Sequence, residues 1–135
     1  MKRLLALFLA TLLFSTACPQ IHADNLSPNV QPRYSHFVSL GAGLSPLGND
    51  IYHISGSATT PSNKYSIKLT VSVEQFLGGS WGTIYSWDTT SNLTAFFNAD
   101  RALLSGTYRV HTHAKAYLNG VLVEEQDAYS AEINN

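Results

Sequence analysis

The chain has 135 residues, with 8 lysines and arginines against 9 aspartates and glutamates, so its formal net charge is −1 when histidine is neutral. This balance excludes the basic excess that a nucleic-acid-binding face requires. The single cysteine, Cys18, excludes disulfide staples and cysteine-ligated zinc or iron–sulfur sites.

The N-terminus has the features of an export signal. Lys2 and Arg3 are followed by an almost entirely apolar run at residues 4–14, which ends in small residues before Pro19. Such a run is too short for the roughly 20 apolar residues that cross a bilayer, whereas a charged start and a short apolar stretch are typical of a signal peptide. We therefore predict a signal peptide at residues 1–23 and no transmembrane span in the mature protein.

Two processing sites remain open. Residues 21–23 (Ile-His-Ala) fit a signal peptidase site, and cleavage there releases a diffusible, secreted chain. Residues 15–18 (Ser-Thr-Ala-Cys) form the alternative, a bacterial lipobox in which an acylated Cys18 anchors the protein to the cell membrane. A lipobox usually has leucine where this chain has Ser15, so we favour secretion over the lipid anchor.

The mature chain begins with a predicted flexible leader at 24–33, which is polar and contains two prolines. From residue 34 to 135, alternating apolar positions and regularly spaced turn residues predict one β-domain. The predicted strands lie at 34–44, 51–60, 65–77, 81–87, 92–99, 106–118 and 121–133. About seven short strands favour an all-β fold, an immunoglobulin-like antiparallel sandwich of two sheets, with a small barrel as the alternative.

The clearest hairpin joins the third and fourth predicted strands. The third strand has apolar residues at every second position, namely Ile67, Leu69, Val71 and Val73. Gly78-Gly79 predicts a tight turn, after which one side of the returning strand carries Trp81, Thr83, Tyr85 and Trp87. We expect this aromatic row to belong to the core; the alternative is an exposed row that stacks on sugar rings of a carbohydrate.

A second hairpin is predicted at Gly120, which follows an asparagine. With a two-residue loop, Lys115 faces Glu124 as an exposed cross-strand pair. The same register turns Glu125 and Asp127 toward the side of the core, which is unfavourable if that side is buried. We therefore expect either a bulge that resets the last strand or a position at the edge of the sheet.

Two resemblances support this fold. Residues 105–110 (Ser-Gly-Thr-Tyr-Arg-Val), followed by Ala114, resemble the penultimate strand of fibronectin type III and related immunoglobulin-like domains. That resemblance implies a structural role for Tyr108, whose ring and hydroxyl would anchor the corner before the strand.

Over residues 34–133, the chain is similar to a family of small uncharacterised secreted proteins of Gram-positive, mostly Firmicute, bacteria. The order of motifs that carries this similarity is Gly56-Ser57, 67–71, Gly79-Ser80-Trp81, Ser86-Trp87 and 106–110. The family has no established activity, so the resemblance implies secretion and a sandwich and no mechanism.

His111 and His113 are the candidate metal ligands. They lie two residues apart on a predicted strand, so both imidazoles project from one face. Arg109 and Lys115 flank them and would repel a cation, and the local sequence places no acidic residue nearby. We therefore expect a solvated cationic stripe, which faces Gln126 across the hairpin, and predict no metal or other cofactor.

Catalytic signatures are missing from the sequence. No serine lies in a Gly-x-Ser-x-Gly elbow, and Asp88, Asp100 and Asp127 are spread singly, so we predict no enzymatic activity. We expect a monomeric interaction module, secreted or at the cell surface, that binds an unknown extracellular or cell-envelope partner. The alternatives are a secreted small effector, such as an inhibitor or bacteriocin-like protein, and a lipoprotein anchored through Cys18.

Overall fold

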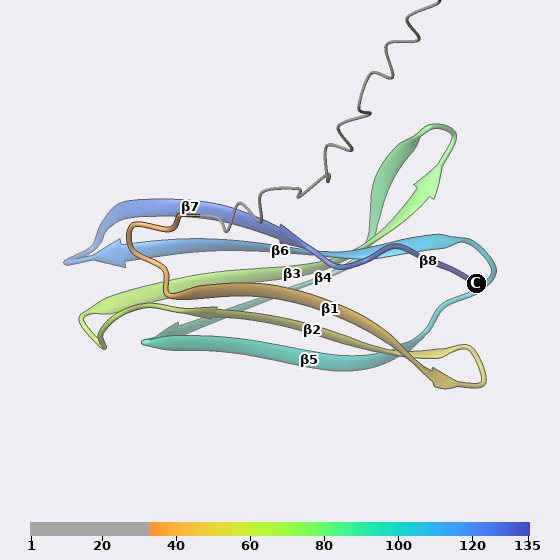
Figure 1. The fold of residues 1–135 in the computed structure, drawn as a ribbon, viewed down its shortest axis with the longest axis horizontal. Helices are drawn as coiled ribbons and strands as arrows, with labels where there is room; N and C mark the ends of the chain where they lie inside the picture. Colours follow the sequence, from red (N-terminus) through yellow and green to blue (C-terminus); the bar gives the residue numbers. More distant parts are fainter. Residues whose placement is uncertain (1–32) are drawn as a thin grey trace, which may run out of the picture. The chain divides into compact units, whose positions relative to one another are not determined.

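The computed structural model describes residues 33–135 (Figure 1). The predicted signal peptide, Cys18 and all of the predicted leader except Arg33 lie outside the described residues. The strands are β1 (Ser39–Gly48), β2 (Ile51–Thr59), β3 (Tyr65–Leu77), β4 (Ser80–Asn92), β5 (Thr94–Ala102), β6 (Thr107–Leu118), β7 (Val121–Tyr129) and β8 (Ile133–Asn134). The described part of the chain contains no helix that is long and apolar enough to span a membrane.

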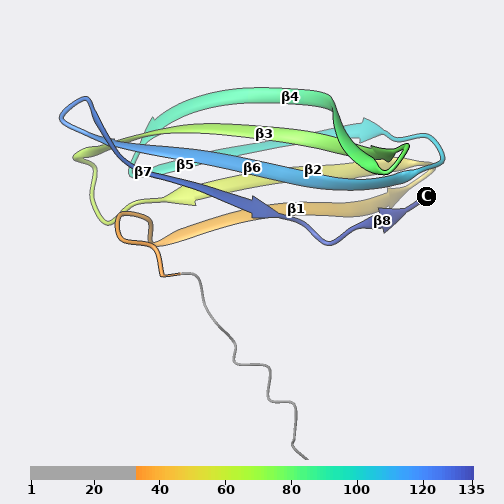
Figure 2. The same cartoon turned by 90° about the horizontal axis from the view of Figure 1, so that it is seen from above.

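The strands form two antiparallel sheets that face each other (Figures 1 and 2). The smaller sheet has the order β1-β2-β5, and the larger has the order β4-β3-β6-β7, with β8 paired to β6. The prediction of an all-β, two-sheet antiparallel structure is thus confirmed, and the barrel alternative is wrong for residues 33–135.

Both predicted hairpin turns are present. Gly78 and Gly79 join β3 to β4 with φ values of 58° and 86°, and Asn119 and Gly120 join β6 to β7 with φ values of 51° and 78°. Positive φ at both central residues gives a turn whose twist matches that of the flanking strands. The glycines serve this geometry because they have no Cβ to clash.

The hydrophobic core fills the space between the sheets and confirms the alternation predicted for β3. Apolar side chains from both sheets and from the segments beside them are buried there, the largest fully buried ones being Ile54, Ile67, Leu69, Val71, Val73, Leu103 and Val110. The burial of these apolar side chains between the two sheets therefore holds the layers together.

Several strand boundaries differ from the prediction: β1 ends at Gly48 instead of 44, β5 is Thr94–Ala102 instead of 92–99, and the last predicted strand, 121–133, divides into β7 and β8. The two largest shifts are at the start of β1 and the end of β4. β1 begins at Ser39, five residues later than expected, and β4 continues to Asn92, five residues beyond the predicted end. The extension of β4, residues 88–92, lies at a sheet edge and consists of polar residues only, so it lacks the apolar alternation that marks a strand. Leu93, with φ of 67°, makes the turn into β5.

Thr112 is an exception in the core. Its side chain is fully buried on β6, and its Oγ1 has no hydrogen-bond partner among the described residues. Replacing Thr112 by valine keeps the shape and removes an unsatisfied hydroxyl, so T112V is expected to raise the free energy of unfolding by about 1 kcal/mol. Urea denaturation followed by tryptophan fluorescence measures the change.

The matched control for this substitution is Thr90→Val. Thr90 lies on β4 and is exposed, so its hydroxyl is solvated and T90V should change stability by less than about 0.5 kcal/mol. Destabilisation by T112V would show that the buried hydroxyl has a partner, such as an ordered water.

Candidate functional site

A β-bulge in β7 determines what lies on the outer face of the larger sheet. Near the turn, Tyr117 pairs with Leu122, but the next residue of β6, Ala116, pairs with Glu124. Val123 is therefore an extra residue in β7, and it packs against the core. Every later residue of β7 is displaced by one position relative to a simple hairpin.

The displaced register brings acidic side chains to the histidines. Lys115 now pairs with Glu125, and His113 pairs with Asp127. The predicted Lys115–Glu124 pair is therefore wrong by one residue, and so is the expectation that no acid lies near the histidines. The two expectations for the last strand are both met, since β7 has a bulge and lies at the edge of its sheet.

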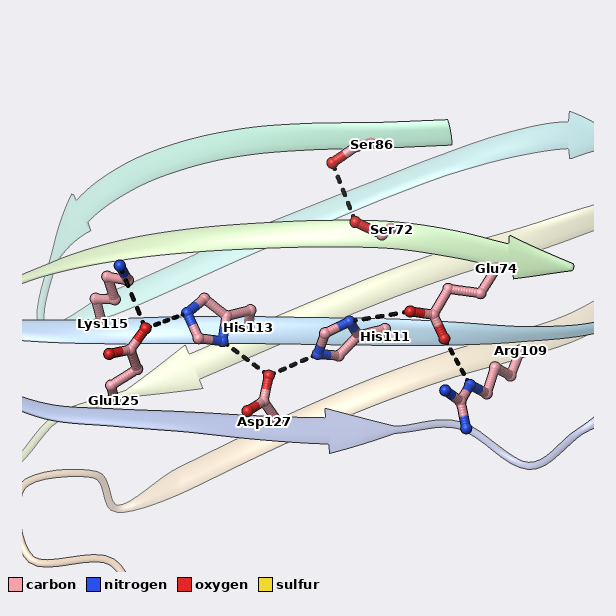
Figure 3. A network of polar contacts seen from close by, with 9 residues as sticks. All are labelled: Ser72, Glu74, Ser86, Arg109, His111, His113, Lys115, Glu125 and Asp127. Atoms are coloured by element: carbon pink, nitrogen blue, oxygen red, sulfur yellow. Dashed lines mark hydrogen bonds and ion pairs between the residues drawn. The ribbon is translucent and has the colours of Figure 1, made fainter. Parts of the chain in front are cut away.

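We call the resulting cluster the histidine row. It comprises Glu74 of β3, Arg109, His111, His113 and Lys115 of β6, and Glu125 and Asp127 of β7 (Figure 3). Asp127 lies at its centre, with Oδ1 at 2.6 Å from His111 Nε2 and 2.7 Å from His113 Nδ1. The remaining nitrogens also face carboxylates: His111 Nδ1 is 3.3 Å from Glu74 Oε1, and His113 Nε2 is 2.7 Å from Glu125 Oε1.

The two cations at the ends of the row are themselves paired. Arg109 Nε lies 2.6 Å from Glu74 Oε2, and Lys115 Nζ lies 3.2 Å from Glu125 Oε1. The predicted cationic stripe is therefore wrong: with both imidazoles neutral, three carboxylates stand against two cations, which gives the row a formal charge of −1.

The hydrogen-bonding capacity of the imidazoles does not match their surroundings. A neutral imidazole has one N–H donor and one lone-pair acceptor, and a carboxylate can only accept. Both nitrogens of His111 and both of His113 nevertheless face carboxylate oxygens. With neutral imidazoles, each ring directs one lone pair at an oxygen, a repulsive contact that either a second ring proton or a bound cation would relieve.

The same contacts shift the pKa values of two carboxyl groups, those of Asp127 and Glu125. Burial by itself would raise the pKa of Asp127, but the hydrogen bonds from His111 and His113 outweigh it and hold the pKa below its usual value. Hydrogen bonds from Lys115 and His113 lower the pKa of Glu125. Both shifts favour the ionised form of the carboxyl groups.

The predicted aromatic row is divided by a second bulge. Val73 pairs with Tyr85 and Glu74 with Thr83, so Ile84 is the extra residue of β4. Across such a bulge the alternation of side chains is reset, and the predicted placement of all three aromatic residues on one side is wrong.

Each tryptophan consequently has its own environment. Trp87 packs against the core, with its ring stacked 4.9 Å from that of Phe97. Trp81 lies at the end of the histidine row, where the Arg109 guanidinium is 4.2 Å from the centre of its ring. The same guanidinium lies 4.4 Å from the centre of the Tyr129 ring, which also stacks on His111 at 4.6 Å.

Tyr108 occupies a buried corner at the start of β6. Its side chain is almost fully buried, and its hydroxyl accepts a hydrogen bond of 3.1 Å from Gln75 Nε2. Burial raises the pKa of Tyr108, and Tyr85 and Tyr52 nearby add to the shift. These contacts agree with the structural role that the resemblance implies.

A pocket of about 270 Å³ lies beside this corner. It is lined by Gln75, Ile84, Tyr85, Ala102, Leu103, Leu104, Ser105 and Tyr108. No histidine or carboxylate lines it, so it is separate from the ionisable groups of the histidine row.

No protein-family model, curated protein or solved structure matches this chain. The similarity to a family of secreted Gram-positive proteins therefore stays a prediction, and function has to be argued from the residues themselves.

The sequence indicated the four members of the histidine row that lie on β6 and missed their acidic partners. Asp127 and Glu125 have the same two-residue spacing as His111 and His113, and a one-residue shift of the hairpin brings the two pairs opposite each other. The sequence did carry one indication of them: a simple hairpin would turn Glu125 and Asp127 toward the apolar side of the predicted strand. Glu74 comes from β3, and its pairing with Arg109 becomes visible only when the sheet order is known.

Proposed function

We propose that the protein is an exported, monomeric, immunoglobulin-like β-sandwich that acts as a non-catalytic binding module at the cell surface or outside the cell. Its binding surface is the outer face of the larger sheet, centred on the histidine row. The signal peptide predicted at residues 1–23 supports the location.

The strand order supports the immunoglobulin-like class. In the constant-type domains of that class, strands A, B, E and D share one sheet and strands C, F and G share the other, so the fourth strand is the one that differs here. Here the first, second and fifth strands form one sheet, while the third, sixth and seventh lie in the other together with the fourth. The buried Tyr108 at the start of the sixth strand fits the tyrosine found near the start of strand F in such domains.

The observation that carries the binding proposal is the partly exposed stack of Arg109 on the rings of Trp81 and Tyr129, which continues into the histidine row. Tryptophan, tyrosine and arginine are the residues most enriched at the energetic centres of protein interfaces. Tyr129 is 51% exposed, so one face of this stack is open to a partner.

A contribution to folding stability does not explain why so many charged side chains gather in the histidine row. Ion pairs at a surface contribute about 0–1 kcal/mol each, and ordering several long charged side chains opposes that gain. Among residues 33–135, moreover, the hydrogen bonds of the histidine rings go to carboxylates and to the Tyr65 hydroxyl, and none goes to a serine. This pairing supports binding over nucleophilic catalysis, which needs a base beside a nucleophile.

A capture experiment tests the proposal. The immobilised protein is incubated with extracts of the cell envelope and with culture medium, and retained molecules are quantified for the wild type and for Tyr129→Ala. We expect one partner class to be retained, with Y129A weakening retention about tenfold or more, because truncating an aromatic anchor removes a large share of binding energy.

The matched control is Phe96→Ala. Phe96 is also a half-exposed aromatic residue, 58% exposed, but it lies on β5 in the other sheet, so F96A should bind like the wild type. No retention by the wild type, or equal losses in both variants, would contradict the proposal. Growth inhibition of neighbouring strains by the purified protein would favour the effector alternative instead.

A further inference from the structure

We propose that His111, His113 and Asp127 form a site for one divalent transition-metal ion, for which zinc fits the donor set best. This inference deepens the proposed function, because the ion would lie in the middle of the binding face. The three side chains offer His111 Nε2, His113 Nδ1 and Asp127 Oδ1, which converge on the solvent side of β6 and β7.

The positions of the donor atoms suit a small ion. One nitrogen from each imidazole and one carboxylate oxygen all lie within 4.8 Å of one another. Tetrahedral zinc has bonds of about 2.0–2.1 Å and therefore separates its ligand atoms by about 3.3 Å. The present separations of 2.6 and 2.7 Å widen to that value through small rotations of side chains that are all partly exposed.

The surroundings of the two histidines provide the independent second observation. A histidine that binds metal through one nitrogen usually donates its other N–H to a carboxylate, which fixes the tautomer and the direction of the ring. Glu125 lies in this position, with its Oε1 hydrogen-bonded to His113 Nε2 at 2.7 Å. Glu74 lies beside the other ring, with its Oε1 at an ion-pair distance of 3.3 Å from His111 Nδ1. When the ion is bound, the two ring protons lie on the outer nitrogens. The inner nitrogens, which hydrogen-bond to Asp127 without the ion, then direct their lone pairs at the ion.

The charges around the site are compatible with a cation. Arg109 and Lys115 are held by Glu74 and Glu125, so neither cation lies between the proposed ligands. Two imidazoles and one carboxylate suit zinc and related ions better than calcium or magnesium, which prefer oxygen ligands. Three protein ligands leave a fourth position open toward solvent, where a donor atom of the bound partner can complete the coordination.

Zinc titration by calorimetry tests the site directly. The protein is purified without a histidine tag, freed of metal with a chelator and titrated with zinc chloride, with magnesium chloride as the hard-ion comparison. We expect one zinc ion per chain and no magnesium binding. His113→Gln and Asp127→Asn should each weaken zinc binding at least a hundredfold, and Glu125→Gln about tenfold, since loss of an outer carboxylate typically weakens affinity by this order.

His53→Gln is the matched control, because His53 also pairs with a carboxylate, Asp100, at 2.6 Å, but on the other sheet. H53Q should bind zinc like the wild type. Circular dichroism shows whether each variant is folded, and imidazole ¹⁵N resonances should shift on zinc addition for His111 and His113 alone.

The metal site would be overturned by the absence of stoichiometric zinc binding, or by unchanged zinc binding in folded H113Q and D127N. Partner capture that persists in a chelator, without any zinc binding, would overturn the metal site and leave the binding module standing. Zinc binding without any captured partner would support the site and contradict the proposed function.

Discussion

Replacing Gly56 by alanine is expected to lower the free energy of unfolding by about 2–3 kcal/mol. Gly56 lies in the middle of β2, where its buried face meets the other sheet. A Cβ built at this position would overlap the side chain of Val71 and would lie 2.8 Å from Thr112 Oγ1. Both neighbours are fully buried on central strands, so neither can move without disturbing the core.

The matched control is Gly82→Ala on β4. A Cβ at Gly82 meets no atom within 4 Å, so G82A should be neutral or stabilise the domain by about 0.5–1 kcal/mol, as alanine usually does in a strand. Denaturant unfolding of both variants measures the difference. Equal changes in the free energy of unfolding for G56A and G82A would show that the sheets do not approach each other closely at Gly56.

A double-mutant cycle identifies the source of the strain. In a Val71→Ala background the overlapping methyl groups are gone, so Gly56→Ala should cost less there than in the wild type, by about 1 kcal/mol or more. If the losses in free energy of unfolding are additive, the strain caused by Gly56→Ala comes from Thr112 or from the backbone rather than from Val71.

The core-facing positions and the hairpin turns were predictable because residues that are close together in the sequence determine them. Alternation along β3 requires only that one face be buried, and Ile67 to Val73 report that face directly. The turn at Gly120 is equally local, since its neighbours along the chain determine its positive φ values. Strands and hairpins could therefore be located from the sequence alone.

The two bulges could not be positioned in the same way. Val123 becomes an extra residue because it packs against the core while Glu125 and Asp127 turn to solvent, and that choice depends on the whole sheet. The sequence showed that Glu125 and Asp127 were in conflict with a simple hairpin but did not show where the register changes. The candidate site depends on this one residue, so its acidic half was missed.

The bulge has a second consequence at Glu124, which connects β7 to the segment before β1. Its carboxylate accepts hydrogen bonds from the backbone N–H groups of Ser35, His36 and Phe37, with distances of 3.2 Å to Ser35 and 3.1 Å to Phe37. Phe37 is buried in the core, and Glu124 lies 89 positions from Ser35 in the sequence. No local pattern could have predicted this contact.

Replacing Glu124 by alanine is expected to lower the free energy of unfolding by about 3 kcal/mol, because three backbone donors lose a charged acceptor at a partly buried site. Hydrogen exchange at residues 35–37 should accelerate in E124A. Glu132→Ala is the matched control: Glu132 is exposed, and its removal should change stability by less than about 0.5 kcal/mol. Unchanged protection of residues 35–37 in E124A would contradict the contact.

The contribution of Glu124 should also depend on pH. Burial by itself would raise the pKa of this carboxyl, but the hydrogen bonds from the backbone of residues 35–37 and from Gln126 outweigh it and lower the pKa below its usual 4.5. A lowered pKa in the folded state means that the stabilisation is complete above the pKa of the unfolded chain and is lost as the pH falls through the folded value. The stability difference between wild type and E124A should therefore be constant near neutral pH and shrink below about pH 4.5. A difference that stays constant down to pH 2 would show that the loss in E124A comes from packing of the side chain and not from its charge.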